Sequence, residues 1–125
     1  MITPLYAAVL TVLLVVLMAR VVRLRWKHKV GLGDGDVAEL RQAIRVHGNL
    51  VETALWALLL LFMMEWSGVQ PVWLHLYGMV LVLARFLHAW GVTHSPYASF
   101  GRTAGTVLTM VLLLTGAAVS LWMSL

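Results

Sequence analysis

Residues 2–22 read ITPLYAAVLTVLLVVLMARVV, a stretch in which Arg20 is the only charged residue. A helix needs about 20 mostly apolar residues to cross the hydrocarbon core of a bilayer. Thr3 and Pro4 are typical of a helix start, because proline has the backbone angle of a first turn and needs no hydrogen-bond donor there. The stretch therefore predicts a transmembrane helix and indicates the class of fold for the whole chain.

Three further apolar stretches follow, and polar or glycine- and proline-containing segments separate them. Asp36 with Glu39 three residues later predicts a capping box at the start of the second helix, and Pro71 is placed to begin the third. The segment from His94 to Tyr97, which contains Pro96, separates the third stretch from the fourth. We predict a single all-α domain over residues 1–125, a bundle of four transmembrane helices. The predicted spans cover approximately residues 2–22, 37–64, 71–91 and 102–123.

The composition supports this class of fold. Hydrophobic residues make up 62% of the chain and charged residues 11%, and the mean hydropathy is +0.91. Soluble domains have roughly 45–50% apolar and about 25% charged residues, so a water-soluble fold is excluded. The chain has no cysteine. It therefore has no thiol nucleophile of its own, and any thiol chemistry must use the thiol of a substrate.

The predicted topology places the basic residues toward one face of the membrane. Nine Lys and Arg against five Asp and Glu give a net charge of +4, which in a soluble protein would suggest nucleic acid. If the four spans alternate in direction, all nine lie toward the face of the first and third loops. The positive-inside rule makes that face cytoplasmic, with both termini on the opposite side. We therefore expect a multi-pass membrane protein with the bilayer, and no nucleic acid, as its partner. The nine are Arg20, Arg23, Arg25, Lys27, Lys29, Arg41, Arg45, Arg85 and Arg102.

Polar residues form a stripe along the second helix. Arg41, Arg45, Asn49 and Glu52 are four, four and three residues apart, which places them within an arc of about 80° on one helix face. Gly48 falls on the same face and leaves room for a ligand to approach the backbone. Ionisable groups inside a span cost at least about 2.5–3.5 kcal/mol each, so they are candidates for function.

Helix rise allows the depths of these groups to be compared. Glu52 and Arg85 are both expected about 9 Å inside the cytoplasmic boundary, where they can meet. Arg45 and Glu52 are about 10.5 Å apart along the helix axis, which predicts no direct pair but suits a small zwitterionic ligand held at both ends. The structural alternatives are a polar lock between helices and a snorkelling Arg45.

The histidines allow a test for haem. His47 and His88 are predicted near the same depth on neighbouring helices, as ligation by two histidines requires. His47 points away from the stripe, however, and we expect neither haem nor a metal ion. His75 is interpreted as a hydrogen-bonded group between helices or at the membrane interface.

The string Arg45-Val-His-Gly-Asn49-Leu-Val-Glu52 resembles the R-x-x-x-N-x-x-E signature of the MAPEG family, the membrane-associated proteins of eicosanoid and glutathione metabolism. Four spans in matching order, a basic first loop and Ala84-Arg85 late in the third helix extend the resemblance over nearly the whole chain. The resemblance implies a homotrimer in a bacterial inner membrane, with glutathione bound between neighbouring protomers near the cytoplasmic face.

The resemblance also implies a set of site residues. Thr53, His88 and Val92 stand at positions where family members place tyrosines that contact the ligand. Arg102, at the start of the fourth helix, lies near the position of an arginine that activates the thiol, and is the implied catalytic residue. The implied glutathione-binding residues are Arg25, Arg45, Asn49, Glu52, Arg85 and His88.

The implied function is that of a glutathione transferase or peroxidase acting on lipophilic electrophiles. A thiol with a pKa near ~8.5 is mostly protonated at neutral pH, and a guanidinium at a helix N-terminus would lower that pKa. The apolar substrate would enter from the bilayer and glutathione from the cytosol. Two other functions stay open: a small proton-coupled transporter using Glu52, and a non-catalytic membrane scaffold. The arginines around Glu52 favour an anionic ligand.

Overall fold

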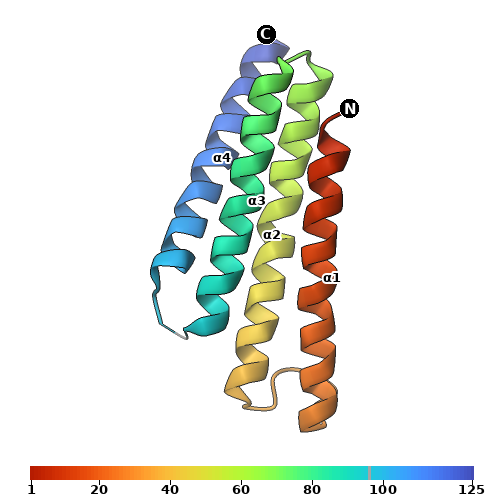
Figure 1. Cartoon of the computed structure of the whole chain (residues 1–125), viewed down its shortest axis with the longest axis vertical. Helices are drawn as coiled ribbons and strands as arrows, with labels where there is room; N and C mark the ends of the chain where they lie inside the picture. The colour runs from red at the N-terminus through yellow and green to blue at the C-terminus, as the bar shows by residue number, and fades with distance from the viewer. Residues whose placement is uncertain (96) are drawn as a thin grey trace.

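The computed structural model describes residues 1–95 and 97–125, so Pro96 of the predicted break lies outside it. Within these residues the chain forms four long helices that run up and down in turn (Figure 1). All four are long and apolar enough to cross a membrane, which confirms the predicted all-α fold. The helices are α1 (Thr3–His28), α2 (Ala38–Trp66), α3 (Pro71–His94) and α4 (Phe100–Ser124).

Helices α2 and α3 form the middle of the bundle. Helix α1 packs mainly on α2, and α4 packs mainly on α3 and also on α2 (Figure 1). The core consists of leucines, valines and alanines on the facing stripes, with Leu61 and Leu81 fully buried between the central helices. Tryptophans at both ends of the bundle are exposed, as expected for side chains at the membrane interfaces. They are Trp26, Trp66, Trp73, Trp90 and Trp122.

Helix α1 is longer than predicted. It continues six residues past Val22 to His28, and its 26 residues span about 39 Å, more than the hydrocarbon core. As a result, the connection between α1 and α2 extends beyond the connection between α3 and α4 (Figure 1). A helix need not end where hydrocarbon ends, because Arg and Lys are good helix formers and their charges reach water.

The predicted cap at Asp36 is wrong. Helix α2 begins at Ala38 with Val37 at the N-cap position, and Asp36 has a left-handed φ of 60°. Arg41 reaches back into the loop instead, where its Nε donates to Asp34 at 2.5 Å and its Nη2 donates to Asp36 at 3.4 Å. The Arg41 guanidinium beside Asp34 holds the pKa of that carboxyl below its ordinary value. The acidic residues therefore hold the loop against α2 through Arg41.

At the opposite end, side chains join α1 to α2 and α3. The Glu65 carboxylate accepts hydrogen bonds from the backbone N–H groups of Ile2 and Thr3, so α2 caps the start of α1. The Tyr6 hydroxyl donates to the His75 carbonyl at 3.0 Å and lies 2.9 Å from Nδ1 of the same residue. This contact confirms His75 as a group that bonds between helices.

The orientation of the bundle is directly testable because the chain has no cysteine. We expect a membrane-impermeant maleimide to label Leu32→Cys and Ala98→Cys in sealed inverted vesicles, because the positive-inside rule places the basic loops in the cytoplasm. The same reagent should label Ser67→Cys only in right-side-out vesicles. The unsubstituted chain is the control for background. The reverse pattern of labelling would contradict the predicted orientation.

Candidate functional site

Arg85 connects three helices inside the bundle. Its side chain comes from α3 and the residue is only 2% exposed. Nη1 donates to Asn49 Oδ1 and to Thr53 Oγ1, both at 2.7 Å, and Nη2 donates to the Gly105 carbonyl at 3.3 Å. Nε is buried and has no hydrogen-bond partner among the described residues. Arg85 therefore joins α2, α3 and α4 at one level, while its Nε–H has no partner among the described residues.

No carboxylate pairs with Arg85 in the part of the chain that the structure describes. The predicted contact between Glu52 and Arg85 is wrong. Glu52 is one residue from Thr53, which turns it about 100° around the helix, away from α3. The result is a buried positive charge whose partners are all neutral, an arrangement that favours an anion nearby.

Arg45 and Glu52 form an ion pair, contrary to the prediction from their spacing that they make no direct pair. Arg45 Nη2 lies 3.7 Å from Glu52 Oε2. The separation of about 10.5 Å along the axis holds for the backbone, but both side chains bend toward each other over Gly48. A Cβ built on Gly48 would lie 3.8 Å from Arg45 Nη1 and from Glu52 Oε1, which is ordinary van der Waals contact, so the pair lies directly over this residue.

The polar stripe of α2 therefore divides between two surfaces. Asn49 and Thr53 face Arg85 inside the bundle. The side chains of Arg45 and Glu52 are 62% and 59% exposed and lie on the outer surface of the single chain. A charged pair on the lipid-facing surface at this depth is costly, so this surface must be covered or must bind a polar ligand.

The ends of α3 and α4 cross with their backbones in contact. A Cβ on Gly91 would lie 2.3 Å from the backbone N of Arg102, and one on Gly105 would lie 2.7 Å from His88 Cβ. Ser99 caps α4, because its hydroxyl accepts a hydrogen bond from the backbone N–H of Arg102 at 3.3 Å. The crossing brings the N-terminus of α4 to the level of the last turns of α3.

His88 and Arg102 belong to this crossing. His88 follows Arg85 by almost one turn on α3 and is buried. Arg102 lies in the first turn of α4 and is exposed, where the helix dipole adds to its positive charge. Arg85 and Arg102 make this end of the bundle cationic, and His88 lies buried beside them. That end can stabilise an anion such as a carboxylate or a thiolate.

Arg25 has partners in the first loop. Its Nη1 donates to the Gly33 carbonyl at 2.8 Å and to the Val30 carbonyl at 3.5 Å, so it holds the turn after α1. Contact of Arg25 with a ligand stays a prediction.

Sequence reasoning missed three contributors to the site. Thr53, considered only as an altered tyrosine position, accepts a hydrogen bond from Arg85, and its place four residues after Asn49 was the available signal. Gln42 donates to the Val92 carbonyl and joins α2 to α3. No feature of the sequence could have identified the Gly105 carbonyl, because every residue has a backbone carbonyl. This carbonyl contacts Arg85 only because of the position at which α3 and α4 cross.

The chain is similar to known proteins over nearly its full length. A family model described as the MAPEG family matches residues 3–122. The chain is 37% identical over 122 residues to the inner membrane protein YecN of Escherichia coli strain K12, covering 98% of this chain and 92% of that protein. The inner membrane protein YecN of E. coli O6:H1, strain CFT073, is similar to the same extent.

Proposed function

The chain belongs to the MAPEG family and is a multi-pass inner membrane protein, and on this premise we propose that it binds glutathione as a transferase or peroxidase for lipophilic electrophiles. The observation that carries the proposal is the buried guanidinium of Arg85, which has neutral partners on α2 and α4 and no carboxylate partner among the described residues. A cation retained at this cost inside a membrane protein selects an anionic ligand.

Glutathione has the charges that this end of the bundle complements. Its two carboxylates suit guanidinium groups, its ammonium suits a carboxylate, and its amides suit an asparagine side chain. In the proposed complex Arg85 and Arg45 bind the carboxylates, Glu52 binds the ammonium and Asn49 binds an amide. Arg25 and His88 complete the proposed set of contacts. The Arg45–Glu52 pair must open to take the ligand, whose carboxylate and ammonium then replace the partners that the two side chains lose.

The proposed chemistry takes place on the sulfur of glutathione. Arg102 and the N-terminus of α4 stabilise the thiolate, which is the nucleophile. In transfer, the thiolate sulfur forms a bond to the carbon of the electrophile, and the leaving group departs with the electron pair. In peroxide reduction, two glutathione molecules become a disulfide while the O–O bond is cleaved to an alcohol and water. The electrophile or peroxide reaches the sulfur from the bilayer.

A glutathione titration in nanodiscs, followed by calorimetry, tests the proposal. The wild type should bind glutathione, and Arg45→Ala and Glu52→Ala should each weaken binding more than tenfold, because each removes one partner of a charge-assisted contact. Arg23→Ala is the matched control, since Arg23 is an exposed arginine of α1 outside the proposed site. Its affinity should stay within about threefold of wild type, the spread expected for a remote surface charge. Absence of binding by the wild type would refute the proposal.

The same titration separates the enzyme from the two other functions considered. Neither a transporter that exchanges protons at Glu52 nor a non-catalytic scaffold requires glutathione. Glu52 is paired with Arg45 on the outer surface of the chain, so its position does not favour a transport path through the bundle.

We also propose that three copies of the chain assemble around the exposed surface of α2. The Arg45–Glu52 pair and the exposed Leu55 and Leu59 lie on this surface, and a neighbouring copy would remove the ion pair from contact with hydrocarbon. Native mass spectrometry should give three times the chain mass of 13.9 kDa. A monomer that binds glutathione with full affinity would contradict this assembly.

A further inference from the structure

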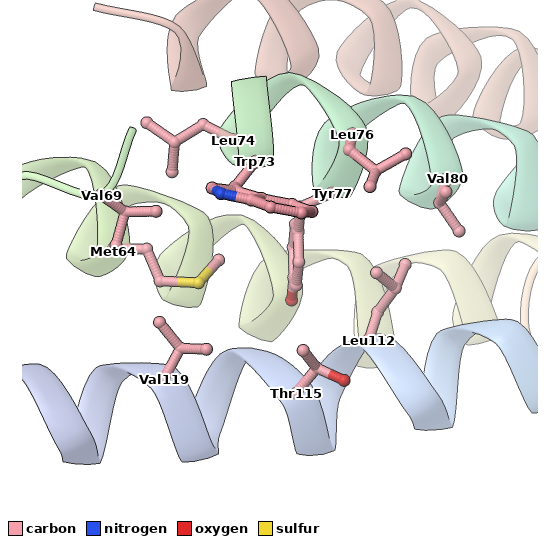
Figure 2. A pocket seen from close by; sticks show the side chains of 10 residues that line it. All are labelled: Met64, Val69, Trp73, Leu74, Leu76, Tyr77, Val80, Leu112, Thr115 and Val119. Atoms are coloured by element: carbon pink, nitrogen blue, oxygen red, sulfur yellow. The ribbon is translucent and has the colours of Figure 1, made fainter. Parts of the chain in front are cut away.

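A cavity lies at the end of the bundle opposite Arg85 and Arg102. It is a groove of about 540 Å³ between α3, α4 and the last turn of α2 (Figure 2). Its lining is mostly apolar, and the polar groups on it are the hydroxyls of Tyr77 and Thr115 and the indole N–H of Trp73. Among the described residues no Asp, Glu, Lys, Arg or His side chain lines it, so the groove disfavours a charged ligand. Grooves of this size accommodate a molecule comparable to a drug or a lipid chain.

The Tyr77 hydroxyl is the unusual group of this groove. Tyr77 is only 6% exposed, and its oxygen is buried without a hydrogen-bond partner among the described residues. Figure 2 shows the side chain reaching from α3 toward α4, with its hydroxyl between the helices. A Cβ at Gly116 would lie 2.9 Å from this oxygen, so a glycine on α4 makes room for the hydroxyl.

An unpaired hydroxyl within a span is costly, because hydrocarbon supplies no water to bond it. Phenylalanine would fill the same space without that cost. A buried tyrosine hydroxyl that has no partner among the described residues therefore points to a partner outside the chain. A phenol is a good donor, so the partner it lacks is a hydrogen-bond acceptor.

We propose that this groove binds a lipid-soluble molecule with a long apolar body and a single hydrogen-bond acceptor, such as a carbonyl, to which Tyr77 donates. The apolar walls take the body of the molecule, and Tyr77 selects for the acceptor. The site does not depend on glutathione binding. Tyr77 and Arg85 are eight residues apart on α3, about 12 Å along the axis, and the two sites share no residue. The proposed groove ligand and the proposed glutathione site are therefore tested independently, and a negative result for one does not contradict the other.

Photolabelling of the full chain in nanodiscs tests the position of the site. The probe is a 16-carbon methyl ketone with a diazirine at mid-chain, and labelled peptides are mapped by mass spectrometry. We expect the label to concentrate on the parts of α3 and α4 that line the groove. Thr115→Phe, which fills the groove from an exposed position, should reduce this label at least fivefold. Val107→Phe, an exposed position on the same helix outside the groove, should leave it unchanged.

A second comparison tests the role of the hydroxyl. Tyr77→Phe should reduce labelling by the ketone about two- to tenfold, the range for one hydrogen bond. Labelling by the matched alkane diazirine, which lacks the carbonyl, should stay the same. The proposal is wrong if the label spreads evenly over the lipid-facing surfaces or if Thr115→Phe does not reduce it. It is also wrong if ketone and alkane respond equally to Tyr77→Phe, or if a second copy closes the groove and no label enters it.

Discussion

Replacement of Arg85 by glutamine is expected to weaken glutathione binding at least a hundredfold and to leave the free chain about as stable as the wild type. The loss of affinity corresponds to about 2.7 kcal/mol, within the range for truncation of one partner of a buried charged contact. Stability should change little because the substitution removes a buried charge whose partners are neutral, while the glutamine amide still donates to Asn49. Calorimetry measures the affinity, and thermal unfolding in the same nanodiscs measures the stability.

This combination distinguishes a ligand site from a structural lock. If Arg85 only held the helices together, Arg85→Gln would lower stability by more than about 2 kcal/mol, as loss of a buried polar network does. Arg20→Gln is the matched control, because Arg20 also donates to a neighbouring helix, at Thr93 Oγ1. Its glutathione affinity should stay near that of the wild type. Unchanged affinity in Arg85→Gln would contradict the assignment of Arg85 to the site.

Replacement of Arg102 by alanine is expected to reduce the thiolate of bound glutathione at least tenfold at neutral pH. A free thiol has a pKa of about 8.5, and a nearby guanidinium at a helix N-terminus lowers the pKa by favouring the anion. Without Arg102, the pKa of the bound thiol should rise toward the free value, so the thiolate should form only at higher pH. Near-ultraviolet absorbance of the thiolate, recorded against pH at saturating glutathione, measures this change.

Arg102→Lys is the control for this experiment, because it keeps a positive charge at the start of α4. It should retain most of the thiolate signal. Binding should persist in both variants, since Arg102 is exposed and makes no side-chain contact that holds Arg85 or Asn49. An unchanged signal in Arg102→Ala would remove this residue from thiol activation and leave glutathione binding in place.

The number and order of the helices could be predicted because a bilayer imposes a length and a composition on each span. The helix ends were predicted less well. Hydrophobicity marks the edge of hydrocarbon, whereas α1 continues past the apolar stretch through basic residues to His28. The proposed cap at Asp36 failed because a capping pattern is also compatible with a turn, and here Arg41 binds both aspartates of the loop.

The residues of the candidate site stay a prediction, and two of the predictions about contacts among them were wrong. Spacing predicted Arg45, Asn49 and Glu52 on one stripe of α2, but Asn49 faces Arg85 inside the bundle while Arg45 and Glu52 lie on the outer surface. It gave backbone separations, however, and these do not show how far a side chain bends. Arg45 therefore reaches Glu52 over Gly48, contrary to prediction. Thr53 was interpreted as a lost contact and is instead a hydrogen-bond acceptor for Arg85.

The sequence by itself determined that this chain is a four-span membrane protein with its positive charge gathered toward one face. Apolar runs and charge asymmetry are local properties that need no knowledge of packing. The tertiary structure alone decided which polar groups meet. Rotation of α2 against α3 directs Asn49 and Thr53 toward Arg85, and the close crossing of α3 and α4 presents the Gly105 carbonyl to the same guanidinium. These contacts depend on how the helices are rotated and spaced relative to one another. Hydrophobic periodicity shows only which broad face of each helix is buried, so it does not fix that rotation or spacing.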